Sequence, residues 1–346
     1  MKVIGIMFGG KSPEYNVSLE SACAVIENID RTRYKVVLIG ITEKGSWYYY
    51  NGEINKIRNN QWMNDKSCQK AYLSCDAQDS SLMVIENQRI RSIQLDAIFP
   101  VLHGSNGEDG TVQGLIALSN IPLIGCGILA SSLCMDKYRS HCLVEHAGIR
   151  VTKGIVFSHL DSFENILKQT IELKYPLFIK PLRAGSSFGI SKIKTSDELY
   201  KAVTVAFNYD TKILIEEEVK GFEVGCAILG DEKLIIGEID EIECNQNFFN
   251  FTEKYTLETS KIHIPARLSI EKRQEIKELC ASVYHILGCQ GFARVDCFIS
   301  EDNEIYFNEV NTIPGFTAHS RFPSMMKAIG LDLTEVITIA IEGTLK

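Results

Sequence analysis

The chain contains FARVD at residues 292–296 and IYFNEVN at residues 305–311, two segments rich in β-branched and aromatic residues. This composition is typical of β-strands, which pack such side chains well against their neighbours. The acidic stretch SEDN at residues 300–303 lies between the two segments and is typical of a tight turn. The sequence therefore predicts a hairpin of two adjacent strands.

The predicted hairpin carries four polar side chains of complementary chemistry. Because alternate side chains of a strand share a face, Arg294 is expected beside Asp296, and Glu309 beside Asn311. Two carboxylates and an amide that converge suit Mg²⁺, a hard ion that takes oxygen ligands and often shares a phosphate. The irregular sequence TIPG at residues 312–315 follows and is typical of an active-site loop. The alternative is a pair of edge strands with ordinary solvated acids.

Length and charge narrow the class of protein. A chain of 346 residues exceeds what one hydrophobic core usually serves, so two or three domains are expected. The formal charge of −8 argues against a nucleic-acid partner, because no basic stripe offsets it. No apolar run approaches the ~20 residues that cross a bilayer, so we expect no membrane partner.

The cysteines and the first residues indicate the compartment. Eleven cysteines are scattered without a C-x-x-C pair, so neither a disulfide framework nor a zinc site is predicted. Cys126, Cys134 and Cys142 are expected to be small buried hydrophobes. The opening sequence MKVIGIMFGG is typical of a strand and not of a signal peptide. The expected location is a reducing cytoplasm.

The first part of the chain alternates predicted strands and helices. A helix over Val17–Ile29 has Asn16 or Ser18 as its expected cap, another helix begins within Gly110–Ser119, and residues 47–89 are polar and irregular. This order predicts a parallel sheet whose ligands lie beyond the carboxyl ends of the strands. The strands are expected at Val3–Phe8, Tyr34–Ile41, Leu95–Val101 and Ile121–Ile124.

One N-terminal motif is misleading. GIMFGGKS at residues 5–12 matches the phosphate-loop pattern G-x-x-x-x-G-K-S. Gly5, however, lies inside the apolar strand, and Pro13 and Glu14 separate the motif from any helical pattern. We therefore reject a phosphate loop here.

The rest of the chain is expected to form two further units. The α/β chain divides into an N-terminal domain over 1–127, a central small subdomain over 128–210 and a C-terminal subdomain over 211–346. Expected elements are a helix opened by Asp136 and Lys137, a strand over Leu177–Pro181, a loop over Arg183–Gly189, strands over Ile213–Glu218 and Glu223–Leu229, and a helix over Ile270–Leu287.

Two regions of these units suit a nucleotide. Lys180 ends a strand just before the glycine-serine loop, whose backbone N–H groups can fold over phosphate oxygens. Lys137 is a candidate second cation. The strand ILIEEEV at residues 213–219 ends in three acids, which are candidate acceptors for an adenine amino group and a ribose. A solvated loop and a solvated strand end are the alternatives.

With these motifs in this order, the chain resembles the ATP-grasp enzymes, specifically the D-alanine–D-alanine ligase family. The resemblance covers nearly the whole chain. Its markers are GGKSPEYNVS (9–18), LHG (102–104), GEDG (107–110), MDK (135–137), KP (180–181), GSS (185–187), EKY (253–255), RVD (294–296), EVN (309–311) and PG (314–315). The implied fold is ATP-grasp, an α/β fold in which a parallel-sheet domain precedes two ATP-grasp subdomains.

The resemblance implies a two-step reaction that uses ATP. The carboxylate of D-alanine attacks the γ-phosphate to give D-alanyl phosphate and ADP, and the amine of a second D-amino acid then expels phosphate. Two Mg²⁺ or Mn²⁺ ions at Asp296, Glu309 and Asn311 would neutralise charge on the transferring group. Glu14 would bind the first ammonium. Arg294 and the N–H of Gly315 would stabilise the tetrahedral oxyanion.

The resemblance also assigns the residues that surround the substrates. His103 would face the first substrate, with a buried histidine that caps its turn as the alternative. A mobile loop at about 245–260 would close the site, and its Tyr255 would join Ser186 and Glu14 in a latch. Ala184 departs from the glutamate of many relatives. The implied ATP-binding residues are Lys137, Lys180, Ser187, Glu216, Val219, Glu223, Lys254 and Asn308.

Two positions bear on the second substrate. Phe251, where relatives commonly carry tyrosine, and Arg321, next to Ser320 in the acceptor pocket, resemble the D-alanine–D-serine ligases of vancomycin resistance. Retention of Lys254 and Tyr255 favours an amine over a hydroxyl nucleophile, so D-alanine and D-serine are the expected partners. The resemblance also implies a homodimer. A housekeeping D-alanine–D-alanine ligase, a ligase for another amino acid and an inactive nucleotide-binding regulator are the alternatives.

Overall fold

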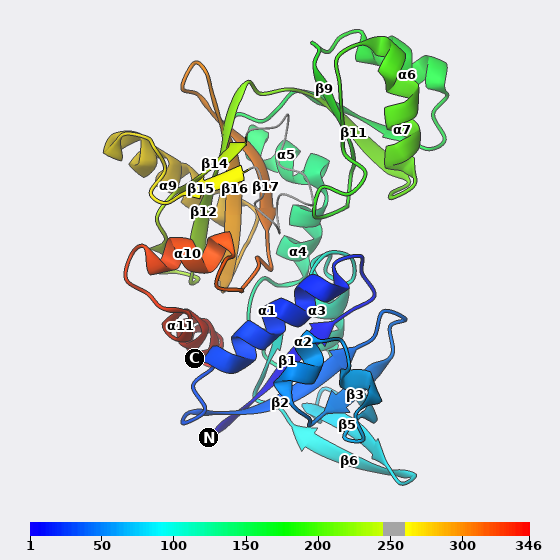
Figure 1. Cartoon of the computed structure of the whole chain (residues 1–346), viewed down its shortest axis with the longest axis vertical. Helices are drawn as coiled ribbons and strands as arrows, with labels where there is room; N and C mark the ends of the chain where they lie inside the picture. Colours follow the sequence, from blue (N-terminus) through cyan, green and yellow to red (C-terminus); the bar gives the residue numbers. More distant parts are fainter. Residues whose placement is uncertain (245–259) are drawn as a thin grey trace.

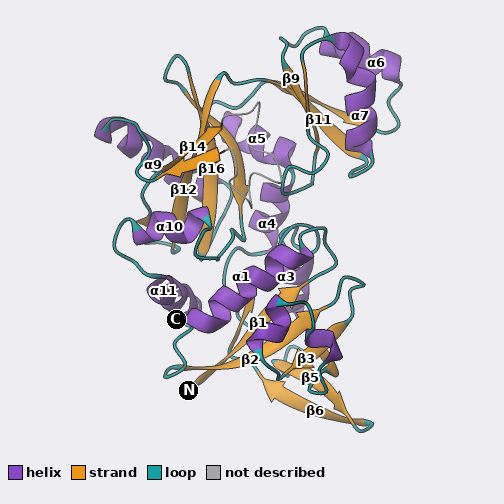
Figure 2. Ribbon diagram, viewed as in Figure 1, coloured by secondary structure: helices purple, strands orange, loops and turns teal. Residues whose placement is uncertain are grey.

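The computed structural model describes residues 1–244 and 260–346. Within these ranges the chain forms three β-sheets (Figures 1 and 2). The sheet of the N-terminal part lies at one end of the molecule, the small sheet of the middle part at the other end, and the C-terminal sheet between them (Figure 1). The architecture is α/β, as expected.

The N-terminal sheet has the strand order β6-β5-β4-β3-β2-β1-β7. Its strand β1 pairs in parallel with β2 and β7, as the alternating pattern predicts. The other pairs are antiparallel, because the stretch expected to be irregular over 47–89 folds into strands. The strands are Lys2–Gly9 (β1), Tyr34–Ile41 (β2), Trp47–Tyr50 (β3), Gln69–Leu73 (β4), Ser81–Glu86 (β5), Arg89–Gln94 (β6) and Ala97–Pro100 (β7).

Helix α1, Tyr15–Asn28, follows β1 and packs on this sheet. The expected cap was wrong: the helix begins before Asn16 and Ser18, and Ser18 is buried, where its hydroxyl accepts a hydrogen bond from the Gly9 N–H at 2.8 Å. Gly5 lies within β1, which confirms that the G-x-x-x-x-G-K-S match is not a phosphate loop.

The far edge of the parallel part is shorter than expected. Ile121–Ile124 is not a strand, because only one isolated parallel bridge, Ile98 to Leu123, joins it to β7. Pro122 has no N–H to extend the ladder. The remaining helices of the N-terminal part are Ile54–Arg58 (α2) and Thr111–Leu118 (α3).

The small sheet is antiparallel, with the strand order β10-β9-β11-β8. Its helices α6 and α7 lie at the end of the molecule farthest from the N-terminal sheet (Figure 1). We expected β11 in the C-terminal unit, so the predicted boundary at residue 210 does not follow the sheets. The elements are Gly154–Ser158 (β8), Phe163–Thr170 (α6), Leu177–Pro181 (β9), Ser191–Ile193 (β10), Leu199–Phe207 (α7) and Lys212–Glu217 (β11).

The C-terminal sheet has the order β15-β14-β12-β16-β17, and β13 pairs with β12. Strands β16 and β17 form the predicted antiparallel hairpin, whose turn contains Asn303 at a φ of 62°. The elements are Gly221–Leu229 (β12), Ile235–Ile236 (β13), Asp240–Cys244 (β14), Ser260–His263 (β15), Ile270–Ile286 (α9), Phe292–Ser300 (β16), Ile305–Asn311 (β17), Arg321–Lys327 (α10) and Leu333–Thr344 (α11).

Two helices whose residues were expected in the central unit pack instead on the C-terminal sheet; only the second of them was predicted as a helix. Both α4, Ile128–Met135, and α5, Lys137–His146, contact β17. Asp136 caps α5 as expected, since its carboxylate accepts a hydrogen bond from the Arg139 N–H at 3.0 Å. The start of α5 therefore carries Lys137 to the edge of the C-terminal sheet.

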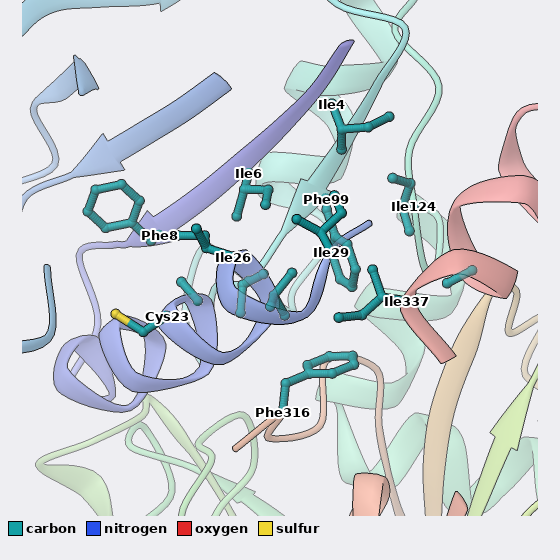
Figure 3. Close-up of a cluster of buried hydrophobic side chains, with 14 of the residues drawn as sticks. Ile4, Ile6, Phe8, Cys23, Ile26, Ile29, Phe99, Ile124, Phe316 and Ile337 are labelled. Carbon is teal, nitrogen blue, oxygen red and sulfur yellow. The ribbon is translucent and has the colours of Figure 1, made fainter. Parts of the chain in front are cut away.

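The largest hydrophobic core joins the N-terminal and C-terminal parts (Figure 3). Phe99 on β7 lies 5.4 Å from Phe292 on β16 and 5.5 Å from Phe316, measured between ring centroids. The small sheet has a core of its own, formed by residues 155–215. The N-terminal and C-terminal parts thus share one core, and the middle part does not.

The composition gave two expectations, one for the cysteines and one for membrane-spanning segments. Ten of the eleven cysteines have described side chains, and these ten are free thiols; Cys126 and Cys134 are buried as expected, but Cys142 is exposed on α5. Among the described helices, no stretch has both the length and the apolar character needed to cross a membrane.

Candidate functional site

The β16–β17 hairpin brings the predicted metal-binding face together. Asp296 is the register partner of Glu309, and Arg294 is the partner of Asn311, so all four side chains share one face. Arg294 donates two hydrogen bonds of 2.7 Å to the Asp296 carboxylate, and Asn311 donates a third at 2.8 Å. These contacts fix Asp296, which is 1% exposed, at the centre of the face.

The side chains on this face suit a divalent cation only if the amide oxygen of Asn311 acts as a ligand beside the carboxylates. In residues 1–244 and 260–346 no three His, Cys, Asp or Glu side chains gather closely enough to hold a metal by themselves. Asp296, Glu309 and Asn311 supply two carboxylates and an amide oxygen, which are the ligands that Mg²⁺ and Mn²⁺ prefer. The chemistry of the three side chains is therefore suited to such an ion.

Arg321 lies against this face and is not open to solvent. It donates hydrogen bonds to both oxygens of Asp240 at 2.7 and 2.8 Å, and another to Glu223 at 2.6 Å. Its guanidinium also lies 3.6 Å from Asp296. Glu223, expected to hold the nucleotide, is thus paired with Arg321. Asp240 is 0% exposed and was missed by sequence reasoning, because residues 238–243 contain four acids and no local motif marks this one as buried.

Two buried lysines enter the site from different elements. Lys137 at the start of α5 donates to the Ala184 carbonyl at 2.8 Å, and its ammonium lies 3.7 Å from Glu309. Ala184, which replaces the glutamate of many relatives, thus holds Lys137 through its backbone carbonyl. Lys180 on β9 pairs with Glu216 on β11. Both lysines are 7% exposed, which is unusual unless a lysine is paired or functional.

Glu216 has an unsatisfied acceptor that suits a ligand. One of its carboxylate oxygens pairs with Lys180, and the other, Oε2, is buried and finds no hydrogen-bond partner in the described part of the chain. A buried oxygen in this state costs free energy unless a donor reaches it. His141, which sequence reasoning missed, lies nearby and bonds the carbonyl of Asn308 at 2.7 Å. Burial lowers the pKa of His141.

The glycine-serine loop meets the N-terminal part at Glu14. Ser186 donates a hydrogen bond to Glu14, so two of the three residues of the expected latch are in contact. A Cβ on Gly185 would come within 2.6 Å of the same carboxylate, so a larger residue here would displace the Glu14 side chain. Ser186 and Ser187 have φ values of 50° and 59°, a left-handed backbone that clusters at functional sites.

His103 is buried, and both of its ring nitrogens contact protein atoms. Nδ1 lies 2.9 Å from the Ile313 carbonyl oxygen, and Nε2 lies 2.9 Å from the Ser21 hydroxyl. Burial lowers the pKa of the imidazole to about 4. These contacts match the alternative of a buried, hydrogen-bonded histidine, although with Ile313 and Ser21 instead of its own turn.

Glu108 belongs to the GEDG motif at residues 107–110 and lies close to the Ile313 backbone, like His103. One carboxylate oxygen accepts from the Gly104 N–H at 2.8 Å and the other from the Ile313 N–H at 3.0 Å. Burial and the charge of Glu14 raise the pKa of this carboxyl to about 8. The spacing HGxxxE gave no signal of this role, because it depends on a partner 205 residues away in sequence.

The remaining predicted residues divide into two groups. Ser320 lies beside Gly315 at the start of α10, and its hydroxyl lies 2.8 Å from that of Thr317. Val219 lies between β11 and β12, half-buried. Phe251, Lys254 and Tyr255, with the expected mobile loop, lie outside the described residues.

Comparison with known proteins assigns the family. The family descriptions "D-ala D-ala ligase N-terminus" and "D-ala D-ala ligase C-terminus" match residues 3–126 and 143–342. The chain belongs to the D-alanine–D-alanine ligase family. It is therefore an ATP-dependent ligase, of a family that uses D-alanine with a second D-amino acid or hydroxy acid and generally needs a divalent metal.

Individual relatives of this ligase differ in their names. The chain is 43% identical to the vancomycin C-type resistance protein VanC1 of Enterococcus gallinarum, covering 96% of this chain and 95% of that one. It is 41% identical to a D-alanine–D-alanine ligase of Caldicellulosiruptor bescii, covering 98% and 95%. The solved structure of the VanG D-Ala:D-Ser ligase from Enterococcus faecalis superposes with a TM-score of 0.92 at 49% identity, covering 99% of both chains. Such similarity establishes the ATP-grasp fold.

Proposed function

We propose that this ligase joins D-alanine to D-serine through D-alanyl phosphate. The D-alanine carboxylate oxygen attacks the γ-phosphorus of ATP and ADP leaves. The D-serine nitrogen then attacks the acyl carbon, the C–O bond to phosphate breaks, and the amine loses a proton. The observation that carries the ligase chemistry is the shared face of Arg294, Asp296, Glu309 and Asn311 beside two buried lysines.

We assign the nucleotide to the junction of the small and C-terminal sheets, where Lys137 at the start of α5 contacts the Ala184 carbonyl of the loop after β9. Lys137 and Lys180 would contact phosphates, and the unsatisfied Oε2 of Glu216 would accept from the adenine amino group. A Mg²⁺ or Mn²⁺ pair held by Asp296, Glu309 and Asn311 would neutralise phosphoryl charge when bound. Val219, Glu223, Asn308, Ser187 and Lys254 complete the proposed set.

We assign the reacting D-alanine to the space between Glu14 and Arg294. Glu14 would bind its ammonium and is held in place by Ser186. Arg294, fixed by its two bonds to Asp296, and the N–H of Gly315 would stabilise the oxyanion of the tetrahedral intermediate. Tyr255 completes the proposed catalytic set with Glu14 and Ser186.

Arg321 supports D-serine as the acceptor. Its hydrogen bonds to Asp240 and Glu223 give the guanidinium a fixed direction beside Ser320, and a fixed donor can orient an acceptor that carries a hydroxyl. Phe251 in place of tyrosine would open space for that hydroxyl. The alternative is a housekeeping ligase that joins two D-alanines, because such ligases are among the relatives.

The test is phosphate release by the purified ligase with Mg-ATP, with D-alanine alone and with D-alanine plus D-serine, the products being identified by mass. D-Serine is expected to raise turnover, with D-alanyl-D-serine as the main product; L-serine serves as the control. Full turnover with D-alanine alone and only D-alanyl-D-alanine would identify the housekeeping alternative. Light scattering of the same preparation tests the homodimer that we also propose.

A further inference from the structure

The loop Thr312–Phe316 is held at both of its ends by residues from the N-terminal part. At its start, the Ile313 carbonyl contacts His103 and the Ile313 N–H donates to Glu108. At its end, Phe316 packs against Phe99 at 5.5 Å. The backbone N–H and carbonyl of Ile313 are thus both hydrogen-bonded to side chains of one turn, residues 103–108, that is distant in sequence.

The hydrogen-bond partners fix the state of His103. A carbonyl oxygen can only accept, so Nδ1 must carry the proton that bonds Ile313. Nε2 then accepts from the Ser21 hydroxyl, and the ring is a neutral, single tautomer. Because burial lowers its pKa to about 4, this state persists at neutral pH.

The turn that carries the two side chains is itself firmly placed. Gly104 has a φ of 72°, and its N–H donates to Glu108. The Gly107 carbonyl accepts from Gln113 at 2.6 Å, and Asn106 donates to the Lys11 carbonyl at 3.1 Å. The turn can therefore serve as a fixed support for Ile313.

We propose that His103 and Glu108 are positioning residues that hold the Ile313 peptide and thereby aim the Gly315 N–H at the developing oxyanion. Pro314 lies between the held residue and Gly315, and its ring restricts the backbone there. Phe316 anchors the other side of Gly315 in the shared core. The direction of the Gly315 N–H follows from these constraints. This inference rests on the proposed function, in which that N–H is an oxyanion donor.

In this proposal His103 acts by positioning the Ile313 peptide and not by contacting the first substrate. Preorganised donors lower an activation barrier because they need no reorganisation when charge develops. A displacement of about 1 Å in such a group can cost on the order of 100-fold in rate. Loss of the His103–Ile313 bond should consequently reduce kcat and leave the ground-state affinities for D-alanine and ATP unchanged.

The test compares His103→Asn with His103→Gln. The asparagine amide can take the place of Nδ1 and donate to Ile313, whereas the glutamine amide matches Nε2 and reaches toward Ser21. We expect kcat to fall about 10- to 100-fold in His103→Gln, with KM for D-alanine and ATP within twofold of wild type. His103→Asn should recover most of this loss. Affinity for a phosphinate dipeptide analogue, a tetrahedral anion, should weaken in parallel with kcat.

Controls separate the outcomes. Ser21→Ala should keep kcat within about threefold of wild type, and Glu108→Gln tests the other half of the Ile313 contact should a His103 variant not fold. A raised KM for D-alanine at unchanged kcat, or equal losses in the Asn and Gln variants, would overturn the positioning role. Wild-type protein that forms no dipeptide with any D-amino acid would instead reject the proposed function.

Discussion

Arg294 makes two hydrogen bonds to the Asp296 carboxylate, which holds its guanidinium in one orientation. We expect Arg294→Ala to retain ATP binding and to lose about 10²–10³-fold in dipeptide formation, since one oxyanion donor contributes that much. Isothermal titration with an unreactive ATP analogue and single-turnover product yield measure the two effects. Arg294→Lys, which keeps the charge without the fork, is the control. Normal product yield from Arg294→Ala would contradict the oxyanion role.

His103 should also give a measurable pH dependence of folding stability. Burial lowers its folded-state pKa to about 4 from an ordinary value of 6.5. The unfolded chain therefore binds more protons between these values, and stability is lost as the pH falls from 6.5 to 4. The loss is about 3 kcal/mol from this group. Urea unfolding of wild type and His103→Gln across this range should diverge; parallel curves would contradict the assignment.

The buried pair of Arg321 and Asp240 predicts a stability cost for specificity variants. Arg321→Met removes the partner of a carboxylate that is 0% exposed, which we expect to cost about 3–5 kcal/mol. Adding Asp240→Asn should recover part of this cost. Thermal unfolding checks both variants, and an unchanged midpoint for Arg321→Met would contradict the expectation.

Phe251→Tyr with Arg321→Met should also shift product toward D-alanyl-D-alanine; an unchanged product ratio would argue against the acceptor assignment.

At the scale of residues, sequence motifs predicted which side chains carry the chemistry, but they did not predict the hydrogen-bond partners of those side chains. The shared face of Arg294 and Asp296 followed from strand periodicity alone, because side chains alternate strictly. Asp240 and His141 were missed, since each acts through a contact made only in the folded chain. The burial of Arg321 was missed for the same reason.

At the scale of elements, the start of α5 sets the position of Lys137. Asp136 caps this helix and is 4% exposed. We expect Asp136→Ala to cost about 1 kcal/mol of stability and to raise KM for ATP. Ser162→Ala is the matched control, because Ser162 caps α6 by the same bond, to the Asn165 N–H at 3.2 Å. Unfolding midpoints and initial rates measure both effects, and equal changes in KM for the two variants would contradict a specific role for α5.

The predicted elements failed where the local signal was weak. Residues 47–89 hold four short strands or parts of strands, and the β5–β6 turn uses Asn87 and Gln88 with φ values of 47° and 64°. Such a turn favours Asn-Gly, so Asn-Gln gave no hairpin signal. Long periodic segments were more reliable: Tyr34–Ile41 and Leu177–Pro181 are strands over the predicted residues.

At the scale of the whole molecule, the shared core couples the N-terminal and C-terminal parts. Both tryptophans, Trp47 and Trp62, lie in the N-terminal sheet region, so their fluorescence reports that part alone. Phe322→Ala on α10 should nevertheless lower the midpoint of the unfolding transition followed by fluorescence, because Phe322 belongs to the same core as Trp62. The expected loss in unfolding free energy is about 3–5 kcal/mol. Ile179→Ala, in the separate core of the small sheet, is the control. A fluorescence transition that Phe322→Ala leaves unmoved would contradict the coupling.

The separate core of residues 155–215 has a consequence for inheritance. Genetic exchange between related ligases can replace this block without disturbing aromatic contacts elsewhere. A crossover that takes Phe99 from one parent and Phe316 from another would instead combine side chains selected in different partners. Viable hybrids should therefore inherit the N-terminal and C-terminal parts together, and the block that carries Lys180 is the one free to move between lineages.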